Sequence, residues 1–135
     1  MSAFSVPVQV RFGHCDPAGI VYYPRYFEMI NGVVEDWFAR GVGVSMPALL
    51  YERRLLIPTV SFEVDFPAPS RYGDVLNYEL RVLRLGHASC TLGIHANCGG
   101  ELRLSVRQVI VFVSAETRKA VAIPEDLRAS LAAME

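Results

Sequence analysis

One acidic residue in a glycine- and proline-rich segment is the strongest candidate for chemistry in this sequence. Asp16 stands directly before a proline, and residues 13–19 also contain two glycines. An amphipathic segment begins a few residues later. The first N–H groups of a helix lack partners within the helix and carry partial positive charge, so they can hold an oxyanion. This arrangement predicts that the Asp16 carboxylate, as nucleophile or general base, faces the backbone N–H groups of Tyr22 and Tyr23.

The same spacing also allows a structural role for Asp16. Aspartate before proline favours an Asx turn, and an aspartate upstream of a helix can cap it. Cys15 beside His14 offers a rival nucleophile, but neighbours on an extended chain point to opposite sides, and free cysteine is usually a small packing residue. The histidines His14, His87 and His95 and the three cysteines show no metal-ligand spacing, so no metal site is predicted.

The period of the hydrophobic residues predicts the elements that position this segment. Alternation over residues 6–12 indicates a strand with one buried face. Apolar residues spaced three and four apart then predict a core helix from about Arg25 to a stop at Gly41. Ser45 looks like the cap of a short helix that reaches about Arg53. The candidate loop therefore lies between the first strand and the long helix.

Four more strands are predicted, at residues 60–66, 75–85, 88–97 and 101–113. Gly86-His87 and Gly99-Gly100 favour tight turns, so the sheet should be mostly antiparallel with the long helix on one face. A short helix that begins near Pro124 closes the chain. The fold class is α+β, in a single domain over residues 1–135. In the first of these strands an apolar face alternates with polar residues, as in residues 6–12, and consists of Val60, Phe62, Val64 and Phe66. The side chains expected to point inward in the second strand are Leu76, Tyr78, Leu80 and Val82. Leu127 and Leu131 lie on one side of the last helix.

Composition narrows the classes of partner. Thirteen basic and fourteen acidic residues give a net charge of −1, which argues against nucleic-acid binding. No basic leader and no long apolar run are present, so neither secretion nor membrane insertion is predicted. Three cysteines without a paired spacing indicate a reduced, cytoplasmic protein.

The run from Phe12 to Phe27 closely resembles the active-site loop of the 4-hydroxybenzoyl-CoA thioesterase family of hotdog-fold enzymes. Its most specific part is Cys15-Asp-Pro-Ala-Gly-Ile-Val21 followed by Tyr23-Pro24. A looser similarity extends through residues 58–66, 73–76 and the strand that contains Ser89.

This resemblance implies a hotdog fold, in which a curved antiparallel sheet of about five strands wraps around one long central helix. It also implies hydrolysis of an acyl-CoA thioester without a cofactor, with Asp16 as the catalytic carboxylate and the Tyr23 N–H polarising the thioester carbonyl. Relatives form dimers, often tetramers, with active sites at the subunit boundary. We therefore expect a homo-oligomer, specifically a tetramer built as a dimer of dimers.

Two departures from the family pattern concern the substrate. Asn31 stands where relatives that act on hydroxybenzoyl groups carry an acidic residue, so a contact with an anionic or hydroxyaryl group is not implied. Tyr22 and Tyr26 either line an apolar acyl slot or pack in the core. The basic cluster that grips the CoA phosphates in some relatives is reduced to Arg84 and His87, which are candidates for that contact or ordinary surface charges.

Two alternatives to an aromatic or short-chain acyl-CoA thioesterase remain. Hotdog hydratases pair a carboxylate with a histidine shortly after it, and residues 17–23 contain no histidine. A protein that binds acyl-CoA or an acyl carrier without hydrolysing it would also fit the sequence.

Overall fold

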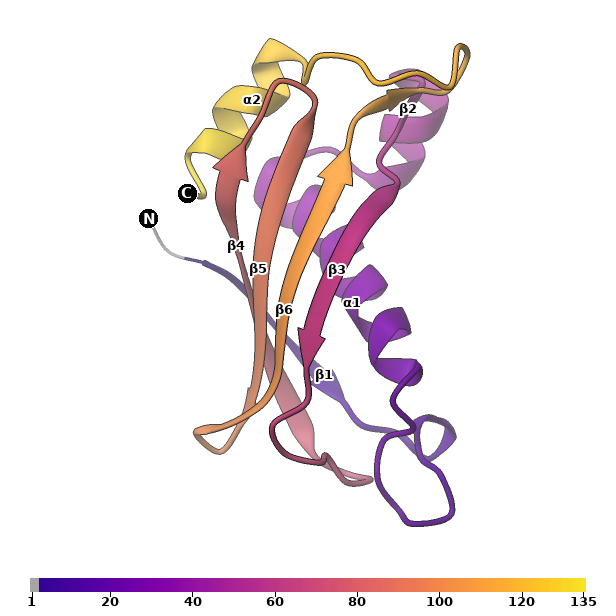
Figure 1. Ribbon diagram of the computed structural model, residues 1–135, viewed down its shortest axis with the longest axis vertical. Coiled ribbons are helices and arrows are strands. Elements are labelled where there is room, and N and C mark those ends of the chain that lie inside the picture. Colours follow the sequence, from indigo (N-terminus) through magenta and orange to yellow (C-terminus); the bar gives the residue numbers. More distant parts are fainter. Residues whose placement is uncertain (1–2) are drawn as a thin grey trace.

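The computed structural model describes residues 3–135, and its main feature is a five-stranded antiparallel sheet (Figure 1). The strand order is β1-β4-β5-β6-β3, so β1 and β3 form the two edges. Two short strands, β2 and β7, pair in a separate ladder. The predicted antiparallel sheet is thereby confirmed. The strands are β1 (Phe4–Gln9), β2 (Leu55–Leu56), β3 (Thr59–Asp65), β4 (Val75–Leu85), β5 (Ser89–Cys98), β6 (Glu101–Val111) and β7 (Val113–Ser114).

The principal helix, α1 (Arg25–Asp36), packs along one face of the sheet and continues directly into the π-helical segment η2 (Trp37–Val42) (Figure 1). The predicted stop at Gly41 is wrong, because Gly41 lies inside η2. A Cβ at Gly41 would stand 2.8 Å from Cδ1 of Trp37, so glycine is needed there for close packing. The chain leaves the helix at Gly43, whose φ of +97° is unstrained only for glycine.

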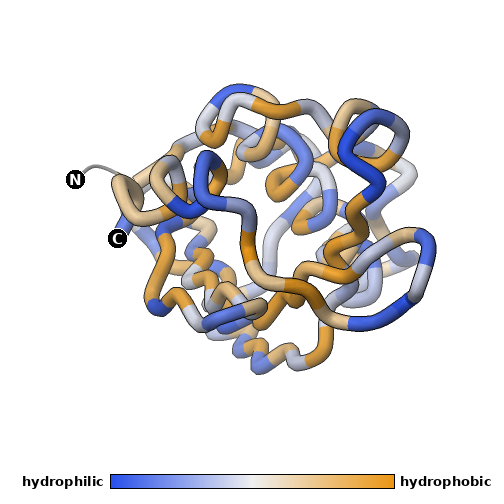
Figure 2. The backbone as a smooth tube through the Cα atoms, turned by 90° about the horizontal axis from the view of Figure 1, so that it is seen from above, coloured by the Kyte–Doolittle hydropathy of each residue, from blue (hydrophilic) through white to orange (hydrophobic). Residues whose placement is uncertain are grey.

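The core lies between α1 and the sheet. In β4 the predicted inward residues Leu76, Tyr78, Leu80 and Val82 are all buried, and exposed residues alternate with them. Figure 2 shows hydrophobic and hydrophilic residues alternating along parts of the backbone. Helix α2 (Glu125–Ala132) buries the predicted pair Leu127 and Leu131. Among residues 3–135, no helix is long and apolar enough to cross a membrane.

The connections follow the predicted turns. The N–H of Ala48 donates to Oγ of Ser45 at 3.2 Å at the start of the short π-helical turn η3 (Ala48–Glu52). The N–H of Gly86 donates to the carbonyl of Ser89 at 2.8 Å, and Gly99 and Gly100 both adopt positive φ in the β5–β6 hairpin. These turns fix the antiparallel register of β4, β5 and β6.

The first strand ends earlier than the alternation predicts. Strand β1 stops at Gln9, and Phe12, expected to point inward, is 79% exposed in the 3-10 turn η1 (Phe12–His14). The N–H of Arg11 donates to Nδ1 of His14, and this local hydrogen bond competes with strand pairing. The chain therefore turns away from the sheet before residue 12.

Strand β3 differs from its prediction in burial. Its apolar face was expected to point inward, but Val60 is 62% exposed and Phe62 and Phe66 are also exposed. Because β3 is an edge strand, it has a neighbour only on the β6 side, and its register with β6 shifts between Thr59 and Ser61. An apolar sheet edge is therefore uncovered in the single chain.

Candidate active site

The loop that follows η1 is closed by hydrogen bonds at its base. Cys15 and Val21 form an antiparallel bridge, and the N–H of Asp16 donates to the carbonyl of Ile20 at 2.9 Å. Gly19 lies in the closed part with a φ of +81°, a conformation that residues with a side chain adopt only with strain. The loop consequently holds Asp16 in one place at the N-terminal end of α1.

The Asp16 carboxylate forms a turn and also keeps one oxygen free. Its Oδ1 accepts the N–H of Ala18 at 2.9 Å, which is the Asx turn that aspartate before proline favours. Within residues 3–135, Oδ2 has no hydrogen-bond partner, and Asp16 does not cap α1. The half-buried side chain lines a cavity of about 290 Å³ together with Cys15, Tyr22 and Arg25. A carboxylate oxygen is thus available inside a concave site.

The two backbone donors expected opposite Asp16 are not equivalent. The N–H of Tyr22 donates to the carbonyl of His14 at 2.9 Å, so the prediction that this amide holds an oxyanion is wrong. The N–H of Arg25 donates to the Tyr22 carbonyl, and Pro24 has no N–H. In the turn that leads into α1, Tyr23 is the residue whose N–H finds no acceptor among residues 3–135.

Cys15 and His14 do not form a nucleophile–base pair. The Cys15 thiol contacts the carbonyl of Arg11 at 3.6 Å, and Nδ1 of His14 accepts the N–H of the same residue. Both side chains therefore bond the η1 backbone. Cys15 packs against the core, as predicted for a small packing residue.

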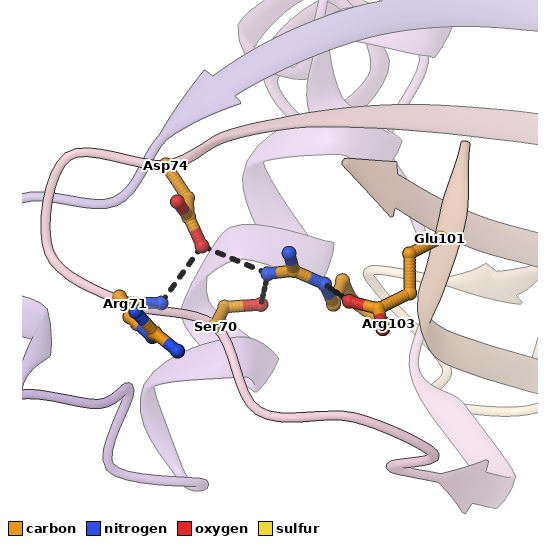
Figure 3. A network of polar contacts seen from close by, with 5 residues as sticks. All are labelled: Ser70, Arg71, Asp74, Glu101 and Arg103. Carbon is orange, nitrogen blue, oxygen red and sulfur yellow. Dashed lines mark hydrogen bonds and ion pairs between the residues drawn. The ribbon is translucent and has the colours of Figure 1, made fainter. Parts of the chain in front are cut away.

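A polar network next to the loop was not predicted from sequence (Figure 3). Nη1 of Arg103, on β6, donates to Oδ2 of Asp74 at 2.8 Å and to Oγ of Ser70 at 3.2 Å, while its Nε donates to Glu101. The N–H of Arg71 also donates to Oδ2 of Asp74 at 2.9 Å. This hydrogen bond and then the Arg103 guanidinium hold the pKa of Asp74 below its ordinary value.

The turn held by this network is bonded to the Asp16 loop. The N–H of Val21 donates to the carbonyl of Ser70 at 2.9 Å, and Ile20 bridges to Arg71. The N–H of Tyr72 donates to the carbonyl of Gly19 at 3.3 Å. The turn at residues 70–74 is therefore one wall of the loop. Gly73 and Asp74 belong to the residues that resemble the thioesterase family, but the sequence alone predicted no role for them.

The remaining predicted site residues are spread over the molecule. Tyr26 is buried in the core against Phe66, whereas Asn31 is exposed on α1 and lines a separate cavity. Arg84 and His87 lie at the end of β4 and in the following turn, at the opposite end of the sheet from the loop (Figure 1). At about 3.3 Å per residue, the length of β4 separates them from the loop by roughly 30 Å.

Arg11 is a cation beside the loop that sequence reasoning missed. It lines a cavity of about 430 Å³ together with Gln9, Phe12 and Tyr72. Gly13 lines both this cavity and the one that contains Asp16, so the two are adjacent. Within one chain, Arg11 is better placed than Arg84 to meet an anion that extends from the Asp16 cavity.

The sequence matches the Thioesterase-like superfamily over residues 10–131, which is nearly the whole chain. The protein belongs to this superfamily. Among curated relatives of this thioesterase-like chain, a 1,4-dihydroxy-2-naphthoyl-CoA hydrolase from Synechococcus elongatus is 24% identical over 120 residues, which cover 88% of each chain. A 4-hydroxybenzoyl-CoA thioesterase from a Pseudomonas species is 26% identical and covers 87% of this chain and 89% of its own.

Solved structures share the fold of this thioesterase-like chain. A thioesterase superfamily protein from a Jannaschia species superposes with a TM-score of 0.92 at 26% identity, covering 98% of this chain and 93% of its own. A 1,4-dihydroxy-2-naphthoyl-CoA thioesterase from Synechocystis gives a TM-score of 0.87 at 20% identity, covering 96% of each chain. The family predicted from the loop motif is thereby confirmed, together with the enzyme class, thioester hydrolase.

Proposed function

We propose that the protein hydrolyses acyl-CoA thioesters to a free acid and CoA at the Asp16 loop. The observation that carries the proposal is that one short segment holds, among residues 3–135, both an unbonded Asp16 oxygen in a cavity and an unbonded Tyr23 N–H just before α1. Thioesters are electrophilic and thiolates leave readily, so one carboxylate and one oxyanion donor are a sufficient set. The names of the relatives support an aromatic acyl group, and short-chain acyl groups are compatible with the same site.

The reaction takes one of two balanced courses. As a general base, Asp16 takes a proton from water while the water oxygen bonds to the carbonyl carbon. As a nucleophile, Asp16 bonds to that carbon itself, and water then hydrolyses the resulting anhydride. In both courses the Tyr23 N–H holds the negative oxygen, the C–S bond breaks, and the CoA thiolate leaves and takes up a proton. Loss of such a donor typically lowers the rate by about 10²–10³.

The decisive experiment measures thiol release from a panel of acyl-CoAs by the wild type and by Asp16→Asn. We expect the variant to lose about 10²–10⁴ in kcat, because its side chain can neither accept the proton nor attack. Asp36→Asn, at the end of α1 in an exposed ion pair with Arg40, is the matched control and should retain activity. Equal release by wild type and Asp16→Asn would remove Asp16 from catalysis. Binding of acyl-CoAs without any release would favour the non-hydrolytic alternative.

A single turnover in ¹⁸O-labelled water tests the nucleophilic role of Asp16. If water attacks the Asp16 carbonyl carbon of the anhydride, the acid product of that first turnover carries an unlabelled Asp16 oxygen and the label enters Asp16. General-base catalysis, and water attack on the acyl carbonyl of the anhydride, both give a labelled product, so an unlabelled product identifies the nucleophile.

We also propose that the protein is a homo-oligomer, with the uncovered β3 edge as one interface and a dimer of dimers as the complete assembly. Exposed apolar residues on an edge strand favour pairing with another chain. Because Arg84 and His87 lie far from Asp16 within one chain, they would contact a bound CoA only from another copy.

A further inference from the structure

A cavity of about 430 Å³, here called the Arg11 cavity, lies beside the Asp16 cavity where the chain leaves β1. It is lined by Gln9, Arg11, Phe12, Gly13 and Tyr72. Its volume is in the usual range of small-molecule sites, about 300–1,000 Å³. Gly13 also lines the Asp16 cavity, and a Cβ placed on Gly13 would meet no atom within 4 Å, so the space beside this shared residue is open. One ligand can therefore extend from one cavity into the other.

Two aromatic side chains line the Arg11 cavity without being packed into the core. Phe12 is 79% exposed and Tyr72 is 61% exposed. Their ring centroids lie 6.0 Å apart and the ring planes meet at 71°, which is an edge-to-face pair. In such a pair the edge of one ring covers one face of the other, so the remaining faces stay open. An open aromatic face beside a cavity is a surface on which a nucleotide base stacks.

Arg11 and Gln9 add a cation and a primary amide to the same cavity. Within residues 3–135 Arg11 forms no ion pair, so its guanidinium is available to bind phosphate oxygens. The Gln9 side chain is exposed and has both donors and an acceptor, the combination that pairs with N6 and N7 of adenine. A stacking surface, a cation and a primary amide together match an adenine nucleotide.

We propose that the Arg11 cavity binds an adenine nucleotide, namely the 3'-phosphoadenosine end of the acyl-CoA whose thioester lies at Asp16. The inference rests on the proposed thioesterase function. The flexible pantetheine arm passes over Gly13, the base stacks on the Phe12–Tyr72 pair, and Arg11 holds a phosphate. One chain then holds both ends of the substrate. This site differs from the phosphate contact at Arg84 and His87 that the family resemblance implies, because those residues lie at the opposite end of the sheet.

Calorimetric binding of adenosine 3',5'-bisphosphate tests the site without any hydrolysis. Tyr72→Ala and Phe12→Ala should each weaken binding about tenfold, because a stacking face is lost. Tyr72→Phe keeps the ring and should restore most of the affinity. Tyr51→Ala, which removes a ring that is 72% exposed on η3, is the matched control and should bind like the wild type. A wild type that does not bind this nucleotide, or a Tyr72→Ala variant that binds it equally well, would overturn the inference.

The base is tested with guanosine 3',5'-bisphosphate, which has the same phosphates on a different purine. The wild type should prefer the adenine nucleotide by about fivefold or more, because the Gln9 amide pairs with N6 and N7 of adenine. Gln9→Met keeps the length of the side chain, removes the amide and should lose the preference. Equal binding of the two nucleotides by the wild type would overturn the assignment to adenine. If Tyr72→Ala does not fold, Gln9→Met and Arg11→Gln decide.

Two thioesters of one acyl group distinguish the nucleotide of CoA from a separate nucleotide. An acyl group that the thiol-release panel identifies is supplied as its CoA thioester and as its N-acetylcysteamine thioester, which has no nucleotide. Tyr72→Ala should raise KM for the CoA thioester about tenfold more than for the truncated one. Adenosine 3',5'-bisphosphate should compete with the CoA thioester. Inhibition or activation without competition would assign the cavity to a separate nucleotide and overturn the inference.

The nucleotide and the thioester are measured independently, so this inference and the proposed function can fail separately. Hydrolysis with the same KM for the CoA thioester in the wild type and Tyr72→Ala would overturn the inference and leave the thioesterase proposal standing. Nucleotide binding that depends on Tyr72, without hydrolysis of any thioester, would support the adenine site and overturn the thioesterase proposal. Neither binding nor hydrolysis would overturn both.

Discussion

The guanidinium of Arg103 lies 2.8 Å from the carboxylate of Asp74, and this ion pair ties β6 to the turn that supports the Asp16 loop. Both side chains are largely buried, so Arg103→Met should cost about 2 kcal/mol of stability. It should also lower kcat more than it raises KM, because the loop that positions Asp16 loosens. Enzyme kinetics and chemical denaturation measure both effects.

Arg107→Met is the matched control for Arg103, because Arg107 lies on the same strand and its ion pair within residues 3–135 is an exposed one with Glu63 at 3.8 Å. That change should cost less than about 0.5 kcal/mol. Hydrogen exchange at the Val21 amide, which donates to Ser70, should accelerate in Arg103→Met alone. Unchanged exchange there would show that the network does not support the loop.

The lowered pKa of Asp74 makes the fold sensitive to acid. The N–H of Arg71 and the Arg103 guanidinium favour the ionised carboxylate in the folded state. The resulting stabilisation is complete above the ordinary aspartate pKa of about 4 and is lost as pH falls through the lower folded-state value. Urea unfolding between neutral pH and about pH 3 should therefore show a smaller loss for Asp74→Asn than for the wild type. Equal losses of unfolding free energy in the two proteins would show that Asp74 does not cause the sensitivity to acid.

Arg11 and Arg84 are alternative candidates for binding the CoA phosphates, and their substitution should affect KM differently. Arg11 lies beside the Asp16 cavity, and Arg84 lies at the far end of β4. If one chain forms the whole site, Arg11→Gln should raise KM for CoA thioesters several-fold, because a phosphate contact typically contributes about 1 kcal/mol or more. Arg84→Gln should have no effect. The reverse result would place the CoA phosphates on a neighbouring copy.

The three cysteines should differ in reactivity. Burial raises the pKa of the Cys90 thiol to about 12, whereas Cys15 and Cys98 are half-buried. Iodoacetamide should therefore modify Cys15 and Cys98 in the native protein and spare Cys90, as mass mapping of peptides would record. Modified Cys15 should block activity by filling the Asp16 cavity, yet Cys15→Ser should remain active. An inactive serine variant would restore Cys15 as a candidate nucleophile.

The exposed edge of β3 should hold the assembly together. Val60→Lys places a charge on that edge, and charge on an edge strand opposes pairing. The variant should dissociate at micromolar concentration in light scattering, whereas Tyr51→Lys, at an exposed apolar position on η3, should not. If the wild-type protein is monomeric at micromolar concentration, the proposed homo-oligomer is wrong.

Hydrophobic periodicity predicted correctly those helices and strands whose burial is determined by their own sequence. Strand β4 has the predicted bounds and inward residues, because alternation between two glycine turns determines both. Gly41 was misassigned as the helix end because its role depends on the Trp37 ring beside it. The exposure of β3 depends on its place at the sheet edge, which its own alternation does not encode.

The candidate site was predictable to a similar extent. Asp16 stood out because the glycines and the proline that hold it are its immediate neighbours. Arg103 and Asp74 are 29 residues apart, and Arg103 and Ser70 are 33 apart. Pairs at such separations depend on how strands and turns are arranged in the folded chain, and no periodic pattern reveals them. The bonded Tyr22 amide likewise depends on how the loop folds back on His14.

The unbonded donor at residue 23 belongs to the main chain, so every amino acid except proline supplies it. An alanine scan across the loop would therefore detect the loss of the Asp16 carboxylate but would not remove the N–H of residue 23, because alanine retains it. A substitution of the Tyr23 side chain by any residue other than proline should therefore leave this donor in place. Tyr23→Pro, or an ester in place of that single amide, is the alteration that would expose the contribution of this atom.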